Sequence, residues 1–278
     1  MSTQADKGRA FRALHERAGA FIIPNPWDMG TARLLEGLGF EALATTSAGY
    51  AFSVGHQDNT IGRDEMMAHV SALVTATALP LSADLENGFG DDAETVAETV
   101  RRAAAAGLVG CSIEDLSARA DGRLYELAHA VDRVRAAVEA AQALPFPFTL
   151  TARAENYLTG RPDLAGTIER LQAFQDADAD VLYAPGLVAA DDIAAVVRAV
   201  DRPVNVVMGL QGASLSLSAL SALGVKRVSV GSALSRAALG AFLRGAREMR
   251  EHGTFAFADE AVSYRDISAM FRPKTIDG

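Results

Sequence analysis

The chain has 278 residues, and 49% of them are hydrophobic, which is enough for one large core or two small ones. Its formal net charge is −9, with acidic and basic residues interspersed, which argues against a surface for nucleic acids or anionic membranes and leaves small molecules as substrates. No apolar stretch has the length of a signal peptide or a membrane span, so we expect a cytoplasmic protein. The single Cys111 excludes an internal disulfide and is expected to be a buried structural thiol.

Short apolar runs alternate with segments of helical periodicity along the whole chain, and no linker divides it. The expected strands are 21–24, 42–46, 81–84, 110–114, 148–152, 181–184, 204–207 and 228–230. The expected helices between them are 30–38, 63–77, 93–106, 126–141, 164–177, 191–200 and 214–223. Glycines just past several helix ends, such as Gly39, Gly107 and Gly224, support one repeated unit. Eight such units predict a (β/α)₈ TIM barrel.

The two ends of the chain are expected to lie outside this barrel. We predict one domain over 1–278, with an N-terminal extension at 1–10 that is frayed to about Lys7, and a C-terminal tail at 250–278. After the eighth strand, 233–249 has the pattern of a long helix, and 255–270 is partly apolar. Such a tail either packs across its own barrel or reaches a neighbouring subunit.

The segment 83–90 carries two carboxylates, Asp84 and Glu86, at the end of an apolar run and before a glycine-rich loop. Residues two apart on a strand share a face, so the two carboxylates would point the same way and need a cation or a proton between them. Carboxylate oxygens without a nearby His or Cys cluster suit Mg²⁺ or Mn²⁺. The alternative is that these residues are solvated or cap the next helix.

Polar residues gather where the predicted strands end, which is where a TIM barrel carries its function. They are Asn25, Trp27, Asp28, Thr45, Thr46, Ser47, Asp84, Glu86, Glu114, Asp115, Arg153, Glu155 and Asn205. Carboxylates facing one arginine are the composition of a divalent cation that holds an anionic substrate. For Asp28 and Asp115 a helix cap is an equally good interpretation.

Several further side chains have two interpretations each. Trp27 and Tyr50 either line the pocket or belong to the core. His56 is either an acid or base in a mobile loop or simply solvated, and His69 and His129 are expected to be packing or surface residues within helices. At the later strand ends, Tyr183 could donate a proton and Asn205 could hydrogen-bond substrate.

Four motifs in register resemble the isocitrate lyase/phosphoenolpyruvate mutase superfamily. They are Asp-x-Glu-x-Gly-Phe-Gly at 84–90, Ser-Ile-Glu-Asp at 112–115, Thr-Ala-Arg-Ala-Glu at 151–155 and Thr-Ser-Ala-Gly at 46–49, and the likeness runs from about 11 to 249. The segments Ile-Pro-Asn-Pro-Trp-Asp at 23–28 and Val-Ser-Val-Gly at 228–231 are similar to a less characterised bacterial branch.

The resemblance implies a Mg²⁺-dependent (or Mn²⁺-dependent) barrel that acts on 2-oxo or 2-hydroxy carboxylates through an enolpyruvate-like intermediate. By position, Asp84 matches the principal metal carboxylate, and Glu86 and Glu114 match acids that hold the ion directly or through waters. Further matches are Arg153 for the substrate carboxylate and enolate oxygen, Thr46, Ser47 and Ala48 for the backbone that binds the substrate carboxylate, and Asp58 for an acid of the gating loop. The superfamily also implies a homo-oligomer, a dimer or a tetramer, with an exchanged C-terminal helix.

The chain departs from the well-studied members in three places. The segment 116–123 lacks the Cys and His of the lyase loop and the Lys and Asn of phosphonopyruvate-handling members, Glu86 replaces an Asp, and Pro185-Gly186 replaces Pro-Glu. We therefore expect a Mg²⁺-dependent lyase or decarboxylase that cleaves a C–C bond in a small 2-oxo or 2-hydroxy (di)carboxylate, but not by the usual route of isocitrate or methylisocitrate cleavage. One alternative is C–P chemistry on a phosphonopyruvate-like substrate, with Arg119, Arg123 or His56 over the phosphonate. Another is a barrel that binds a keto acid and metal without turnover.

Overall fold

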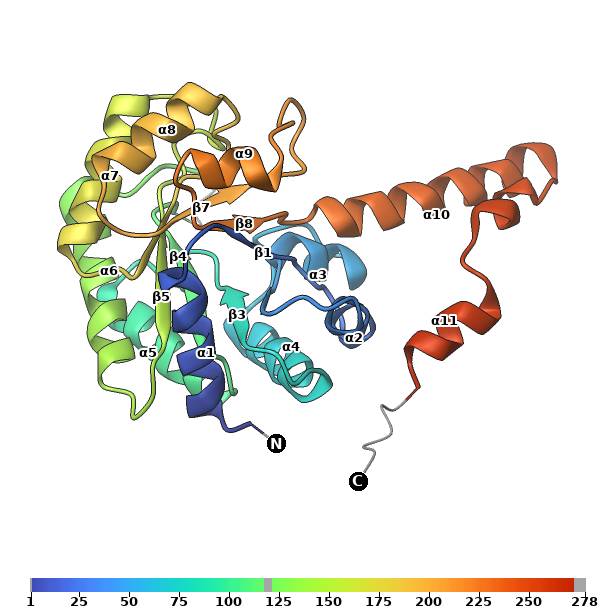
Figure 1. The fold of residues 1–278 in the computed structure, drawn as a ribbon, viewed down its shortest axis with the longest axis horizontal. Coiled ribbons are helices and arrows are strands. Elements are labelled where there is room, and N and C mark those ends of the chain that lie inside the picture. The colour runs from blue at the N-terminus through green and yellow to red at the C-terminus, as the bar shows by residue number, and fades with distance from the viewer. Residues whose placement is uncertain (1, 118–121, 273–278) are drawn as a thin grey trace.

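The computed structural model describes residues 2–117 and 122–272, and its centre is one eight-stranded parallel sheet (Figure 1). The strands follow the order β1-β8-β7-β6-β5-β4-β3-β2. Ala44 N of β2 donates to Pro24 O, next to the end of β1, so the two outer strands of this order also meet. The strands are β1 Phe21–Ile23, β2 Leu43–Ala44, β3 Leu81–Asp84, β4 Gly110–Glu114, β5 Thr149–Arg153, β6 Val181–Tyr183, β7 Val204–Val207 and β8 Arg227–Ser229. The predicted TIM barrel is confirmed.

Helices surround the barrel and continue into a C-terminal arm, and the helices that were expected have bounds within a few residues of the prediction. They are α1 Gln4–Glu16, α2 Met29–Gly37, α3 Ser47–Ser53, α4 Arg63–Ala76, α5 Ala93–Ala105, α6 Leu127–Gln142, α7 Leu164–Asp176, α8 Ala190–Ala199, α9 Leu217–Ala222, α10 Ala233–His252, the 3₁₀ helix η1 Ala256–Glu260 and α11 Tyr264–Met270. The short helix α3 was not expected, because its residues were taken for a tight turn. Cys111 is fully buried on β4, as predicted.

The register of the parallel strands places the C-terminal strand ends at one level. Asp84 of β3 pairs with Ser112 of β4, and Glu114 of β4 pairs with Arg153 of β5. Around the ring, Arg153 pairs with Tyr183, and Tyr183 pairs with Asn205 of β7. Polar residues that are far apart in the sequence therefore meet at one mouth of the barrel.

The expectation of a frayed N-terminus is wrong, because helix α1 begins at Gln4. Its N-cap Thr3 forms a capping box with Asp6, which satisfies amide groups that the first turn leaves free. Gln4 Nε2 donates to the carbonyls of Ala104 and Leu108 at 2.8 Å, and Phe11 is completely buried. Helix α1 is therefore docked on the barrel rather than loose.

The C-terminal helices form an arm that extends away from the barrel (Figure 1). Along it, Phe242 is 69% exposed and Tyr264 87%, so the arm leaves apolar surface uncovered. This speaks against packing across the chain's own barrel, and exchange of the arm between subunits stays a prediction. In the described part of the chain, no helix is long and apolar enough to cross a membrane.

Candidate active site

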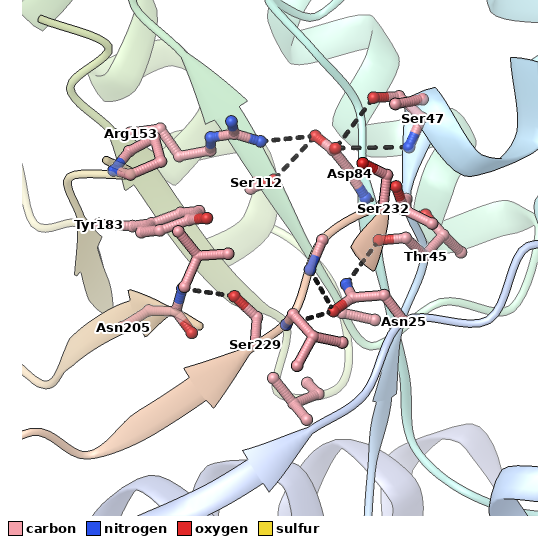
Figure 2. A pocket seen from close by; sticks show the side chains of 18 of the residues that line it. Asn25, Thr45, Ser47, Asp84, Ser112, Arg153, Tyr183, Asn205, Ser229 and Ser232 are labelled. Atoms are coloured by element: carbon pink, nitrogen blue, oxygen red, sulfur yellow. Dashed lines mark hydrogen bonds and ion pairs between the residues drawn. The ribbon is translucent and has the colours of Figure 1, made fainter. Parts of the chain in front are cut away.

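Arg153 lies at the C-terminal end of β5, where three acidic side chains contact its guanidinium, and Figure 2 shows one of them, Asp84. Its Nη1 is 2.9 Å from Asp84 Oδ1 and 2.8 Å from Glu114 Oε1, and its Nε donates to Glu155 Oε1 at 2.8 Å. The guanidinium carbon is 5.0 Å from the ring centre of Tyr183. Charge-assisted bonds in three directions fix the position of this buried cation.

Asp84 is the acid at the centre of this group, and every neighbouring element contacts it. Its Oδ2 accepts from Ser47 Oγ at 3.0 Å and from Ser47 N at 3.4 Å at the start of α3, and its Oδ1 accepts from Ser112 Oγ at 3.4 Å (Figure 2). Its own amide donates to Thr45 Oγ1 at 3.0 Å. The Asp84 carboxylate, with 18% of its side chain exposed, faces the cavity from a fixed position.

Acidic groups outnumber basic ones at this mouth. Burial raises the pKa of Glu114 well above its ordinary value against the opposing effect of Arg153, and burial likewise raises the pKa of Glu155. Although burial disfavours its charge, Arg153 has a raised pKa because Glu114, Glu155 and Asp84 surround it. One guanidinium is therefore shared by three acidic side chains, and either a bound proton or a further cation would relieve the repulsion among them.

Glu86 lies beside this group rather than in line with Asp84. Strand β3 ends at Asp84, and Glu86 has a φ of 50°, so the expected alternation of a strand does not reach it. Glu86 does not line the cavity that Asp84 lines, and its buried Oε1 has no hydrogen-bond partner among the described residues. Burial, and then the charges of Asp84 and Asp58, raise the pKa of Glu86 to about 8.

Arg133 of α6 holds the loop that carries Glu86, and sequence reasoning did not select it. Its guanidinium donates to the carbonyls of Asn87, Gly90 and Asp91. Its guanidinium carbon is 4.2 Å from the ring centre of Tyr125, and only 1% of the residue is exposed. The unusual backbone after β3 is thus supported from outside the barrel.

The oxygen ligands at this site suit a hard cation for two reasons: several of them are carboxylates, and one carboxylate oxygen has no hydrogen-bond partner among the described residues. The unpartnered Glu86 oxygen and the surplus of carboxylates around Asp84 are what a divalent ion would complete. Within residues 2–117 and 122–272, however, no three His, Cys, Asp or Glu side chains are grouped closely enough to hold a metal ion by themselves. An ion held here would need water molecules among its ligands.

The predicted substrate-binding residues separate into two groups. Thr46, Ser47, Ala48 and Asn205 line a cavity of about 170 Å³ that Asp84, Glu114 and Arg153 also line. Trp27 and Tyr50 do not line it, because they lie against other helices. The Tyr50 ring stacks on His69 with ring centres 3.7 Å apart, and the Cβ of Trp27 lies against Gly49 of α3.

The loop after α3 brings one of its two predicted catalytic residues to the cavity. Asp58 lines the cavity and accepts from Ser47 Oγ at 3.4 Å, and desolvation of this carboxylate together with the charge of Asp84 raises its pKa. His56 is exposed and lies outside the lining. Of the segment 116–123, residues 118–121, and with them Arg119, lie outside the described residues.

Asp28 and Asp115, which the sequence left as either site residues or helix caps, both have structural roles. Asp28 caps α2, where its carboxylate accepts from Thr31 N at 2.7 Å. Asp115 lies behind the mouth, where it pairs with Arg170 at 3.1 Å and accepts from Glu155 N at 2.9 Å. Asp115 therefore holds the strand end that carries Glu155.

Of the polar side chains inside the barrel below the mouth, the sequence predicted only Asn205. Ser82, Ser112, Asn205, Arg227 and Ser229 all line the cavity under Asp84 and Arg153. TIM-barrel interiors are usually filled by branched apolar side chains, so this polar lining is unusual. The signal that could have found it is a polar residue at every second position of a strand, as at 149, 151 and 153 and at 227 and 229.

The fold and this site define a class: (β/α)₈ barrels that carry an acid-and-arginine site at the C-terminal ends of the strands. A family model described as phosphoenolpyruvate phosphomutase matches residues 11–250, and the chain belongs to this family, within the isocitrate lyase/phosphoenolpyruvate mutase superfamily. The resemblance found in the motifs is confirmed.

Relatives of the chain include carbon–carbon lyases. A crystal structure of a candidate lyase/mutase from Burkholderia cenocepacia J2315 is 67% identical, with a TM-score of 0.95 over 98% of this chain and 97% of that chain. The 2-methylisocitrate lyase of Escherichia coli K12 is 32% identical over 184 residues, 63% of this chain and 61% of that protein. The oxaloacetate decarboxylase of Chromohalobacter salexigens is 28% identical over 256 residues, 90% of this chain and 87% of that protein.

Proposed function

We propose that the protein is a Mg²⁺-dependent (or Mn²⁺-dependent) carbon–carbon lyase or decarboxylase. Its substrate is a small 2-oxo or 2-hydroxy (di)carboxylate, and the reaction passes through an enolpyruvate-like intermediate. The observation that carries this is the group of Asp84, Glu114 and Arg153 at the end of three adjacent strands, facing one cavity. Relatives named as 2-methylisocitrate lyase and oxaloacetate decarboxylase support the reaction class.

The predicted acidic residues and Arg153 each have a role in this proposal. Asp84 would hold the ion directly, and Glu86 and Glu114 would hold it through water. The bound ion supplies positive charge where negative charge develops on the enolate oxygen. Arg153 binds that oxygen and the adjacent carboxylate, and it is already oriented by its acidic partners before substrate arrives.

The carboxylate next to the enolate oxygen is also held by the start of α3. Thr46, Ser47 and Ala48 line the cavity there, and their backbone is proposed to bind a substrate carboxylate. Asn205 lines the cavity from β7 and is proposed to donate to substrate. A cavity of about 170 Å³ suits an acid of a few carbon atoms.

Asp58 is the proposed proton carrier. Its carboxyl group lines the cavity 3.4 Å from Ser47 Oγ, and its raised pKa allows it to hold a proton closer to neutral pH than an ordinary aspartate does. His56 would reach the same space only after the 54–62 loop moves, because it is exposed. These groups take the place of the cysteine that the chain lacks in the segment 116–123.

C–P chemistry on a phosphonopyruvate-like acid is the second candidate. The family description names a phosphomutase, and the exposed Arg236 of α10 lines the rim of the cavity, where a phosphonate would need a cation. Assays for released phosphate or phosphonate separate this reaction from C–C cleavage. Release from a phosphonopyruvate, without turnover of keto or hydroxy dicarboxylates, would replace the leading proposal.

The test is a calorimetric titration with oxalate, with and without Mg²⁺, because oxalate has the two adjacent oxygens of an enolpyruvate. Wild type should bind oxalate only with Mg²⁺, and Asp84→Ala should lose that binding by about a hundredfold or more. Asp132→Ala is the matched control, because Asp132 is exposed on α6 beside Arg135. Turnover is then screened across 2-oxo and 2-hydroxy dicarboxylates. Oxalate binding with no turnover of any of them would favour a binding protein without catalysis.

We also propose that a second copy of the chain covers the arm formed by α10, η1 and α11. Phe242, Phe255 and Val262 are exposed along it by 69%, 67% and 66%. Burying apolar side chains of this size is the main driving force of association. Light scattering should report a dimer or tetramer, and a monomer would overturn this assignment.

A further inference from the structure

Arg227 is a second arginine of the same cavity, and the proposed chemistry gives it no role. It begins β8, lines the cavity from below and is only 5% exposed. Its Nε donates to Asn205 Oδ1 at 2.9 Å, its Nη2 donates to Thr151 Oγ1 at 2.8 Å, and its Nη1 lies 3.4 Å from His15 Nε2. We call Arg227 and Asn205, which line the cavity, together with the buried Thr151 that accepts from Arg227, the floor.

The partners of Arg227 are all neutral. His15 Nδ1 donates to Phe11 O at 2.9 Å, which leaves Nε2 as an acceptor. Burial and the charge of Arg227 lower the pKa of His15 to about 3, so the imidazole is uncharged at neutral pH. Among the carboxylates of the described residues, none forms an ion pair with Arg227.

A buried guanidinium without a counter-charge is costly, and proteins rarely retain one without a purpose. Arg153 shows the usual solution in the same cavity, because three carboxylates balance it. At Arg227 the counter-charge is missing from the described protein, so an anion from outside would complete the floor. The guanidinium fork is suited to a carboxylate.

The space between the two arginines is open to such an anion. Ser82, Ser112 and Ser229 line the same cavity as Arg153 and Arg227, and their short side chains leave room where branched apolar side chains would fill it. Their hydroxyl groups can also hydrogen-bond an acid that passes between them. The cavity therefore runs from the acidic mouth to the floor.

We propose that the floor is a binding site for the distal carboxylate of the substrate, so that Arg227 selects dicarboxylic over monocarboxylic acids. This inference rests on the proposed function, which places the 2-oxo or 2-hydroxy end of the same molecule at Asp84 and Arg153. Thr151 and Asn205 position the guanidinium. The substrate class narrows to small dicarboxylates with a carboxylate at each end.

Malate and lactate are the probes, because both are 2-hydroxy acids and only malate carries a distal carboxylate. Binding of each is measured by calorimetry with Mg²⁺ on wild type and Arg227→Gln, with turnover checked in parallel. Wild type should bind malate about tenfold or more tightly than lactate, because a charge-assisted hydrogen bond to a carboxylate typically improves affinity by about this factor. Arg227→Gln should lose that preference while its binding of lactate and oxalate is unchanged.

Two further variants separate recognition from folding. Arg227→Lys keeps the charge and should keep part of the malate preference. Arg135→Gln removes an exposed arginine of α6 that pairs with Asp132, outside the lining of this cavity, and should leave the ratio of malate to lactate affinity unchanged. Thermal unfolding of every variant shows whether it is folded at the temperature of the titration.

The outcomes keep the two proposals apart. Failure of wild type to bind oxalate with Mg²⁺ overturns the proposed function. Mg²⁺-dependent oxalate binding with equal affinity for malate and lactate overturns the floor site alone. An Arg227→Gln variant that weakens all three acids equally also overturns it, because that pattern belongs to a structural residue.

Discussion

The mouth and the floor of the cavity each present one buried arginine, and the two arginines have opposite surroundings. Arg153 at the mouth contacts Asp84, Glu114 and Glu155, whereas Arg227 at the floor has only neutral hydrogen-bond partners. The mouth has three acidic side chains around one arginine, whereas no carboxylate of the described residues pairs with the arginine of the floor. One cavity can therefore take a cation at one end and an anion at the other.

The contrast also separates structural from functional contributions. Removing a partner from a buried ion pair leaves an uncompensated charge, which is strongly destabilising. Removing a buried charge that has no partner relieves its desolvation instead. The two arginines should thus respond differently to the same substitution, although both are more than nine-tenths buried.

The largest expected effect comes from Arg153→Met. Three carboxylates lose their cation, and the free energy of unfolding should fall by about 3 kcal/mol or more at pH 7 without Mg²⁺. Arg227→Met should cost at least about 2 kcal/mol less, because it removes an uncompensated charge. Urea denaturation of both variants makes the comparison. Equal losses would show that the charge surroundings of the two arginines do not differ as described.

Arg153→Lys is the control for charge. It keeps a cation near Asp84 and Glu114 but loses the fork that bonds three carboxylates at once. Its stability should lie between wild type and Arg153→Met. A lysine variant as unstable as Arg153→Met would mean that hydrogen-bond geometry, rather than charge, sets the loss.

The sequence predicted the mouth much better than the floor. β3 and β4 have the predicted bounds because short apolar runs between glycines and helices are distinctive. Once eight strands were assigned, the polar residues at their ends had to meet. Asp84, Glu114 and Arg153 were found in this way, and the contacts of Arg153 confirm that they lie together.

The misses have local physical reasons. Arg227 was not among the predicted site residues, because an arginine just before an apolar run is usually at the surface. The expected strand began at Val228, so Arg227 was not seen to share a strand face with Ser229. Glu86 was expected to share the direction of Asp84, but its φ of 50° ends the extended backbone on which that rule depends. Helix α3 was missed because its small first residues also suit a turn.

The next largest effect is the dependence of the free energy of unfolding on pH, through His15 beside Arg227. Burial and the charges of Arg227 and Lys226 lower the pKa of His15 to about 3 in the folded protein, against 6.5 ordinarily. The unfolded chain therefore binds more protons than the folded one between these values, and stability is lost as the pH falls through this window. At pH 5 the loss from this group is about 2 kcal/mol relative to pH 7.

His15→Gln should remove this part of the acid sensitivity, because glutamine keeps an acceptor for Arg227 but does not titrate. Denaturation at pH 7 and pH 5 should show a smaller difference for the variant than for wild type. His129→Gln is the control, because His129 is exposed on α6. A wild-type difference that survives in His15→Gln would assign the acid sensitivity to other groups.

The smallest expected effect tests the support of the floor, and it uses two threonines of one strand. Thr151→Val keeps the shape but removes the acceptor of Arg227 Nη2, and Thr151 is completely buried. Thr149→Val makes the same change two residues earlier on the same face of β5, where the side chain is also buried. Thr151→Val should lower the free energy of unfolding by about 1 kcal/mol more than Thr149→Val, because it leaves a buried donor without its acceptor. Equal losses from the two variants in urea denaturation would mean that Arg227 does not depend on Thr151, and that Asn205 and His15 position the guanidinium.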